Sequence, residues 1–206
     1  RSTRRNRKPD WQHRLINLRQ NRDHNCMSAE QYDIAIIGGG LVGASLACAL
    51  EGFARDHHWS IAVIEAVPMP EDSDQDKPFQ PSYDARSTAL SWGTRQIYQQ
   101  MGLWTELEPH AAAIQHIHVS DKGHLGATRL AASDHNVEAL GYVAPNQWLG
   151  RVLLQGVKQA QHVSWLCPFK VTDFSVGAEQ HTLQLSDEQG AEKTLQAKLV
   201  VLADGG

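Results

Sequence analysis

The chain has 206 residues, 41% of them hydrophobic, and a formal net charge of -4 at pH 7. This is enough for a buried core and predicts one domain, or one domain and part of a second. No apolar run approaches the roughly 18 residues of a membrane span, and no apolar stretch typical of a secretory signal follows the basic N-terminus. Three widely spaced cysteines match neither a disulfide framework nor a zinc motif, which favours a reducing cytoplasm.

The first 26 residues differ from the rest in charge. They hold eight basic and two acidic residues, so their charge is +6, whereas residues 27–206 hold 11 basic and 21 acidic residues, so -10. A basic arm could contact nucleic acid or anionic lipid. However, Met27 stands five residues before the first expected strand, where a cytosolic protein of this type would begin. We interpret residues 1–26 as an extension outside the fold.

The stretch 32–65 predicts a strand, a turn, a helix and a second strand. The apolar runs 34–37 and 61–64 are typical of buried parallel strands, and 44–54 is rich in Ala and Leu, as helices are. Residues 38–43 form the pattern G-x-G-x-x-G. Glu65 follows the second strand directly, where its carboxylate can accept hydrogen bonds from a ribose. This order is that of a dinucleotide-binding fingerprint.

Each remaining residue of the fingerprint has a predicted role. Gly38 permits the tight turn after the strand, Gly40 lets a pyrophosphate approach the backbone, and Gly43 lets the helix pack closely on the strand. The N–H groups of Leu41 and Val42 lie at the helix N-terminus, where the helix dipole favours an anion. The alternative is a tight strand-to-helix turn without a ligand.

A proline-punctuated, acidic segment, 68–81, predicts an exposed loop, and it lacks the glycine turn and closing glutamate of a calcium-binding loop. Arg86 then precedes a helix expected over 91–101. Its planar guanidinium could reach a phosphate or ribose of a nucleotide. A surface ion pair with Asp84 is the alternative, and the sequence leaves both open.

The pattern over 114–120 predicts a strand, with a turn and a partner strand over 125–131. His116 and His118 share a face of this strand and His124 is near, but no acid or cysteine completes a metal site. We therefore predict no metal site here.

A short strand over 141–144 precedes a helix that Pro145 and Asn146 open and that extends to about residue 160. An apolar strand, 199–202, ends the chain and leads into Asp204 and Gly205. Between them we predict a small antiparallel β-meander over the main sheet, built from four strands: 163–166, 170–176, 182–185 and 193–196.

Three landmarks in this order resemble the class A FAD-dependent aromatic hydroxylases, the family of para-hydroxybenzoate hydroxylase. They are the fingerprint with Glu65, the segment Asp84-x-Arg86, and Asp204-Gly205. The segments 83–90, 117–124 and 140–143 further resemble the ubiquinone-biosynthesis branch of this family. The resemblance implies an α/β fold, a Rossmann-like FAD-binding domain whose N-terminal part is residues 27–206, truncated before the substrate domain. The positions it assigns to FAD, together with the helix N-terminus, are Gly38, Gly40, Leu41, Val42, Gly43, Glu65, Arg86, Asn146 and Asp204.

The resemblance also implies an activity: a monooxygenase that uses FAD, NAD(P)H and dioxygen to hydroxylate a polyprenylated methoxyphenol in ubiquinone biosynthesis. Because the flavin carries the oxygen chemistry, we assign no catalytic residue. The expected setting is the cytoplasm, or the inner-membrane surface beside other ubiquinone-biosynthesis enzymes, without nucleic acid. A Rossmann NAD(P)-dependent dehydrogenase is the rival enzyme, but a long loop and the Asp84-x-Arg86 helix replace its further βα units. A non-catalytic flavin-binding assembly subunit is the other alternative, and the fragment alone is expected to be inactive.

Overall fold

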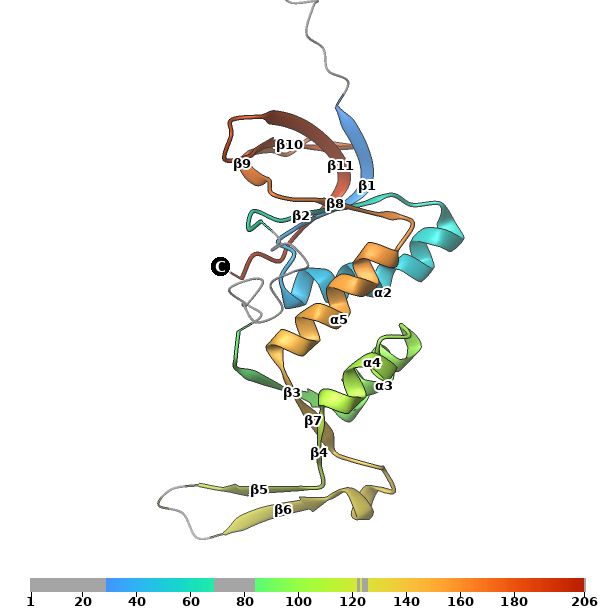
Figure 1. The fold of residues 1–206 in the computed structure, drawn as a ribbon, viewed down its shortest axis with the longest axis vertical. Coiled ribbons are helices and arrows are strands. Elements are labelled where there is room, and N and C mark those ends of the chain that lie inside the picture. Colours follow the sequence, from blue (N-terminus) through green and yellow to red (C-terminus); the bar gives the residue numbers. More distant parts are fainter. Residues whose placement is uncertain (1–28, 69–83, 122, 124–125, 206) are drawn as a thin grey trace, which may run out of the picture.

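The structure, a computed structural model, describes residues 29–68, 84–121, 123 and 126–205 (Figure 1). The basic extension 1–26, most of the acidic loop 68–81 and His124 lie outside the described residues. One six-stranded sheet dominates, in the order β8-β2-β1-β11-β10-β9. Its first four strands are parallel, and β10 and β9 are antiparallel additions. The strands are β1 (Glu30–Ile37), β2 (Ile61–Ile64), β8 (Val163–Leu166), β9 (Lys170–Ser175), β10 (His181–Ser186) and β11 (Glu192–Leu202).

Two helices cover one face of this sheet and pack against each other (Figure 1). Helix α2 (Leu41–His57) connects β1 to β2, and α5 (Asn146–Gln159) precedes β8. Ala44 and Ala47 of α2 are fully buried, and their small side chains let the helix approach β1. The apolar face predicted for the second helix is buried, as Leu153 and its neighbours show.

The antiparallel strands β9 and β10 fold over the other face of the parallel strands, as predicted for the β-meander. Leu183 and Leu185 of β10 and Leu195 of β11 pack with Ala35 and Ile64 of the parallel strands. Ala35 alternates with residues that face the helices, so this cluster lies on the opposite side.

Two details of the predicted meander differ from the structure. The strand expected at 163–166, β8, is not part of the meander but the outer parallel strand beside β2. The chain leaves this sheet after β2 and returns to it as β8, directly after α5, which lies on the same face as α2. A strand that returns beside its neighbour after a connection through a helix runs parallel to it. The segments 193–196 and 199–202 form one strand, β11, which pairs with β10 over residues 192–197 and with β1 over residues 195–202.

The middle of the chain forms a second antiparallel sheet, in the order β3-β7-β4, and a hairpin that projects from it (Figure 1). The predicted strand 114–120 is interrupted at Gln115, which separates β4 from β5. Ser91 caps α3, since its Oγ accepts the Thr94 N–H at 3.1 Å. The elements are β3 (Ser87–Ser91), α3 (Trp92–Gln100), α4 (Trp104–Leu107), η1 (Glu108–His110), β4 (Ala112–Ile114), β5 (His116–Ser120), β6 (Ala127–Ala131), η2 (Ala132–His135) and β7 (Gly141–Pro145).

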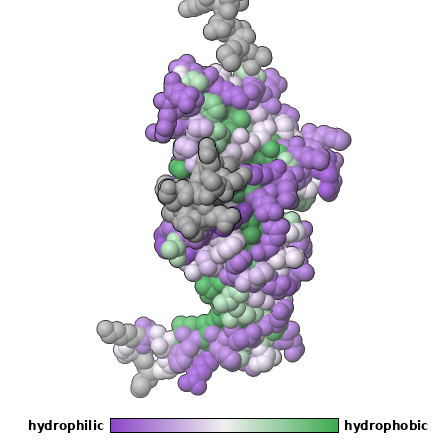
Figure 2. Space-filling view, in the orientation of Figure 1, coloured by the Kyte–Doolittle hydropathy of each residue, from purple (hydrophilic) through white to green (hydrophobic). Residues whose placement is uncertain are grey.

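Hydrophilic residues prevail on the face shown in Figure 2, and apolar residues appear in narrow groups among them. Within the described part of the chain, no helix combines the length and apolar character needed to cross a membrane. The α/β architecture predicted from the sequence is confirmed.

Candidate cofactor-binding site

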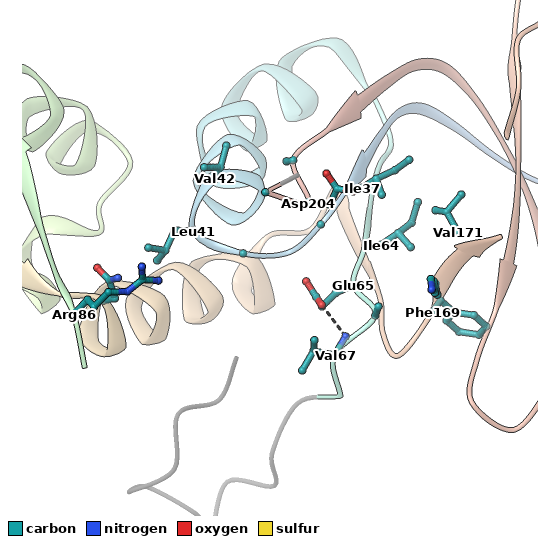
Figure 3. A pocket seen from close by; sticks show the side chains of 17 residues that line it. Ile37, Leu41, Val42, Ile64, Glu65, Val67, Arg86, Phe169, Val171 and Asp204 are labelled. Carbon is teal, nitrogen blue, oxygen red and sulfur yellow. Dashed lines mark hydrogen bonds between the residues drawn. The ribbon is translucent and has the colours of Figure 1, made fainter. Parts of the chain in front are cut away.

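A cleft of about 720 Å³ opens at the carboxyl ends of β1, β2 and β11 (Figure 3). Residues 37, 38, 40–42, 64–67 and 203–205 line it from the sheet side, and Arg86, Asn146 and residues 169–171 complete its walls. Open α/β sheets bind ligands at this edge, and a cleft of this size is typical of small-molecule and cofactor sites. Most of the predicted site residues therefore lie together around one cleft.

Two glycines of the fingerprint, Gly38 in the turn after β1 and Gly43 in the first turn of α2, have no room for a side chain. Gly38 has a φ of +101°, and a Cβ there would lie 2.6 Å from the backbone oxygen of Ala203. A Cβ on Gly43 would lie 1.9 Å from the oxygen of Gly38. The tight turn at Gly38 and the close helix packing at Gly43 agree with the prediction.

Helix α2 points its N-terminus at the cleft. Gly40 is its N-cap, in an extended conformation, and no side chain caps the helix. Leu41 and Val42 line the cleft, and the first turn of the helix contains no acidic residue. The first N–H groups of a helix lack intrahelical partners, and the helix dipole favours an anion beside them.

Glu65 lies at the end of β2 with only 6% of its surface exposed. Its Oε2 accepts the N–H of Gly39 and its Oε1 accepts the N–H of Val67, both at 2.7 Å (Figure 3 shows the second bond). A carboxylate offers about four lone-pair sites, so these two bonds alone do not use up its acceptor capacity. Glu65 thus stabilises the glycine turn and also lines the cleft.

Arg86 forms the ion pair with Asp84 that was one of the two alternatives, and it also lines the cleft. Its Nε donates to Oδ2 of Asp84 at 2.5 Å, while its side chain is 75% exposed and lines the cleft at the end away from Phe169 (Figure 3). The backbone N–H of Arg86, followed by its guanidinium, holds the pKa of Asp84 below its usual value.

Asn146 is buried at the start of α5, beside Arg86. Its backbone N–H donates to the Arg86 oxygen at 2.8 Å, and its Oδ1 accepts the hydroxyl of Thr88 at 2.6 Å. Its Nδ2 donates to Oδ1 of Asp84 at 3.4 Å. These bonds hold Asn146 and Arg86 as one unit at the wall of the cleft.

Asp204 is exposed at the end of β11, and Gly205 beyond it has a φ of +78°. Both line the cleft. Their place is set by the parallel pairing of β11 with β1, which brings the end of β11 beside the glycine turn.

The segment 169–171 also lines the cleft, although the sequence assigned it no role in the site. Phe169 N–H holds it against the end of β2, since it donates to the Glu65 oxygen at 2.8 Å. Just before the segment, the last residue of β8 is held in the same way, because Glu65 N–H donates to the Leu166 oxygen at 2.9 Å. The sequence carries no signal for this role, because the parallel direction of β8, whose carboxyl end meets the same sheet edge, is set by its pairing with β2.

The histidine-rich hairpin forms separately from the cleft. His116 and His118 are exposed on β5, which belongs to the two-stranded sheet. Among the residues that the structure describes, no three His, Cys, Asp or Glu side chains are grouped to hold a metal ion.

No protein-family model matches the chain. It is 33% identical over 175 residues to the uncharacterized protein slr1300 of Synechocystis, across 85% of this chain and 39% of that protein. It is 30% identical over 176 residues to the ubiquinone hydroxylase UbiL of Rhodospirillum rubrum, across 84% and 37% of the two chains. A third relative is the 3-demethoxyubiquinol 3-hydroxylase of Escherichia coli, 28% identical across 87% of this chain and 42% of the relative. The chain thus spans about two fifths of the length of these relatives.

The fold matches solved flavoprotein structures. OxyS anhydrotetracycline hydroxylase from Streptomyces rimosus matches with a TM-score of 0.65 at 19% identity, over 85% of this chain and 32% of that chain. The flavin-dependent monooxygenase PieE, in complex with FAD and substrate, matches with a TM-score of 0.64 at 15% identity, over 85% and 30%. The chain is thus similar in sequence to ubiquinone-biosynthesis hydroxylases and shares the fold of flavin-dependent monooxygenases, in agreement with the predicted resemblance to the class A FAD-dependent aromatic hydroxylases.

Proposed function

We propose that the chain is part of an FAD-dependent monooxygenase that uses NAD(P)H and dioxygen to hydroxylate a polyprenylated methoxyphenol in ubiquinone biosynthesis. One observation carries the proposal: the glycine turn, the α2 N-terminus and Glu65 surround a cleft in a chain 30% identical to a ubiquinone hydroxylase.

The residues around the cleft fit a dinucleotide such as FAD. Glycine at positions 38 and 43 lets the backbone of Ala203 and of the turn itself pack closely, which holds the turn in place at the edge of the cleft. The N–H groups of Leu41 and Val42 would hold the pyrophosphate, with Gly40 beside it.

Side chains from the other walls would hold the rest of the dinucleotide. Glu65 would accept a ribose hydroxyl. Arg86 and Asn146 would contact the nucleotide from the opposite wall, and Asp204 would lie near the pyrophosphate. All four residues line the cleft.

When bound, the flavin supplies the redox chemistry, since it accepts electrons from NAD(P)H and delivers them to dioxygen. The protein binds and orients the cofactor and keeps water from the reacting atoms. Accordingly, we assign no proton-transfer step to a residue of this chain.

The proposed substrate suggests where the enzyme works. A polyprenyl tail is apolar and partitions into a bilayer, because burial of apolar surface away from water is favourable. We therefore place the protein in the cytoplasm, peripheral to the inner membrane and near other enzymes of the same route.

The test is oxygen and NAD(P)H consumption by the full-length protein. The concentrations of oxygen and NAD(P)H should fall together. Without a phenol, the oxygen consumed should appear as hydrogen peroxide. A polyprenyl methoxyphenol should lower the peroxide yield and give a hydroxylated ring. A dehydrogenase would instead reduce NAD(P)+ with an alcohol or acid under nitrogen, and full activity without oxygen would contradict the proposal. The 206-residue chain alone should lack turnover, because it spans about two fifths of its relatives.

A further inference from the structure

Gly39 occupies a position at which the G-x-G-x-x-G pattern allows any residue, yet the structure leaves no space there for a side chain. A Cβ on Gly39 would lie 2.3 Å from Cη2 and 2.8 Å from Cζ2 of Trp165, and 3.1 Å from Cβ of Glu65. Gly39 is also buried. The requirement for glycine comes from packing, since its φ lies outside the left-handed region that favours glycine.

Trp165 lies in β8, more than 120 residues after the glycine turn. The strand is held beside β2, with Trp165 in register with Val63. Its side chain packs against the core on the helix side of the sheet. The indole Nε1 is buried and finds no hydrogen-bond partner among the described residues, so packing rather than hydrogen bonding holds the ring.

Gly39 is held from a second direction by Glu65. Its N–H donates to Oε2 of Glu65 at 2.7 Å, while the indole blocks movement toward β8. Gly40, the next residue, is the N-cap of α2. The position of Gly39 therefore decides where the first N–H groups of α2 point.

We propose that Trp165 is a positioning residue of the dinucleotide site, whose indole supports the glycine turn through Gly39. This rests on the proposed function, because the turn matters for binding only if a nucleotide phosphate lies beside it. The ligand class that reports this role is an adenosine diphosphate, either ADP or the same moiety within FAD.

The test uses full-length protein with Gly39→Ala, Trp165→Phe and the double variant. Trp165→Phe removes the ring atoms that a methyl group on Gly39 would meet. Gly52→Ala is the control for an added methyl, since nothing lies within 4 Å of a Cβ there. Trp59→Phe is the control for the change of ring, since Trp59 stacks on His57 beyond the other end of α2.

Calorimetric titration with ADP and with FAD, at a temperature where circular dichroism shows every variant folded, should separate binding from stability. Gly39→Ala should weaken both ligands by about tenfold or more, and Trp165→Phe by roughly threefold. The double variant should bind within about threefold of Trp165→Phe alone, because its larger space accepts the methyl group. Both controls should bind like the wild type.

Three outcomes would overturn the proposal. One is a double variant whose fold-loss in ligand affinity equals the product of the fold-losses of the two single variants. Another is Trp165→Phe that lowers the melting temperature and leaves both dissociation constants unchanged, since the role would then be structural only. The third is Gly39→Ala that binds as Gly52→Ala does.

Two further results have a defined meaning. If Gly39→Ala does not fold, a folded double variant that binds ADP supports the proposal, and one that fails to fold contradicts it. If the wild type binds neither ADP nor FAD, the proposed function and the positioning role both fail. In that case, the melting temperatures of the wild type, the two single variants and the double variant still measure the packing of Trp165 on Gly39.

Discussion

Replacing Glu65 with alanine should reduce stability even without a cofactor. The carboxylate accepts two backbone N–H groups at 2.7 Å, and that of Gly39 is buried. A hydrogen bond to a charged group contributes about 1.5–3 kcal/mol, and the loss leaves the Gly39 N–H without this acceptor. Removal of a buried carboxylate offsets part of the cost, since its desolvation penalty disappears. We expect a net loss of about 2–3 kcal/mol, or roughly 4–12 °C in melting temperature for a domain of this size.

The same substitution should weaken FAD binding in the full-length protein. Loss of the ribose hydrogen bonds to a charged acceptor should cost about 1.5–3 kcal/mol, which is roughly 10- to 150-fold in the dissociation constant. Thermal unfolding of the flavin-free protein measures the first effect, and titration of flavin fluorescence measures the second.

Glu65→Gln is the matched control. Its carbonyl oxygen can accept one N–H, but its amide group presents donors to the other, so both losses should be intermediate. An alanine variant with an unchanged melting temperature would show that the two backbone bonds do not support the turn. An unchanged flavin dissociation constant would remove Glu65 from the cofactor site.

Three further predictions use other residues. Gly38→Ala should destabilise more than Gly102→Ala in urea unfolding: both glycines have a positive φ, but only at Gly38 does the new Cβ meet another atom, the Ala203 oxygen at 2.6 Å. Equal losses of unfolding free energy in the two variants would mean that backbone strain, about 1–3 kcal/mol, accounts for the whole destabilisation at Gly38. Arg86→Ala should reduce flavin occupancy and turnover and leave the melting temperature unchanged, since the side chain is 75% exposed; normal occupancy would refute its role. Burial raises the pKa of the Cys48 thiol from 9.0 to about 11, so the unfolded chain releases this proton first. The contribution of the thiol to stability should be present below pH 9.0 and lost between pH 9.0 and about 11. Cys48→Ala should therefore reduce the slope of the unfolding free energy against pH in that range, and an unaltered slope would contradict this role of Cys48.

The local elements of this fold could be predicted from the sequence. The strand, glycine turn and helix depend on neighbours a few residues apart, so apolar periodicity and glycine spacing were enough to place β1, α2 and β2. The same holds for the start of α5 at Asn146, which follows directly from Pro145. Since the first residues of α2 and the end of β2 are adjacent in any such unit, the core of the candidate site followed as well.

Only the tertiary structure decided which distant segments meet. The parallel pairing of β8 and β11 with the central strands places residues 169–171 and Asp204 at the same edge as the glycine turn. It also brings Trp165 against Gly39, a contact that no pattern near either residue reveals. Strand order and direction depend on which apolar faces pack together across the whole chain, and short apolar runs such as 163–166 suit a parallel or an antiparallel neighbour equally well. For that reason the sequence determined the parts of the cleft that are adjacent in the chain, and long-range packing determined the rest.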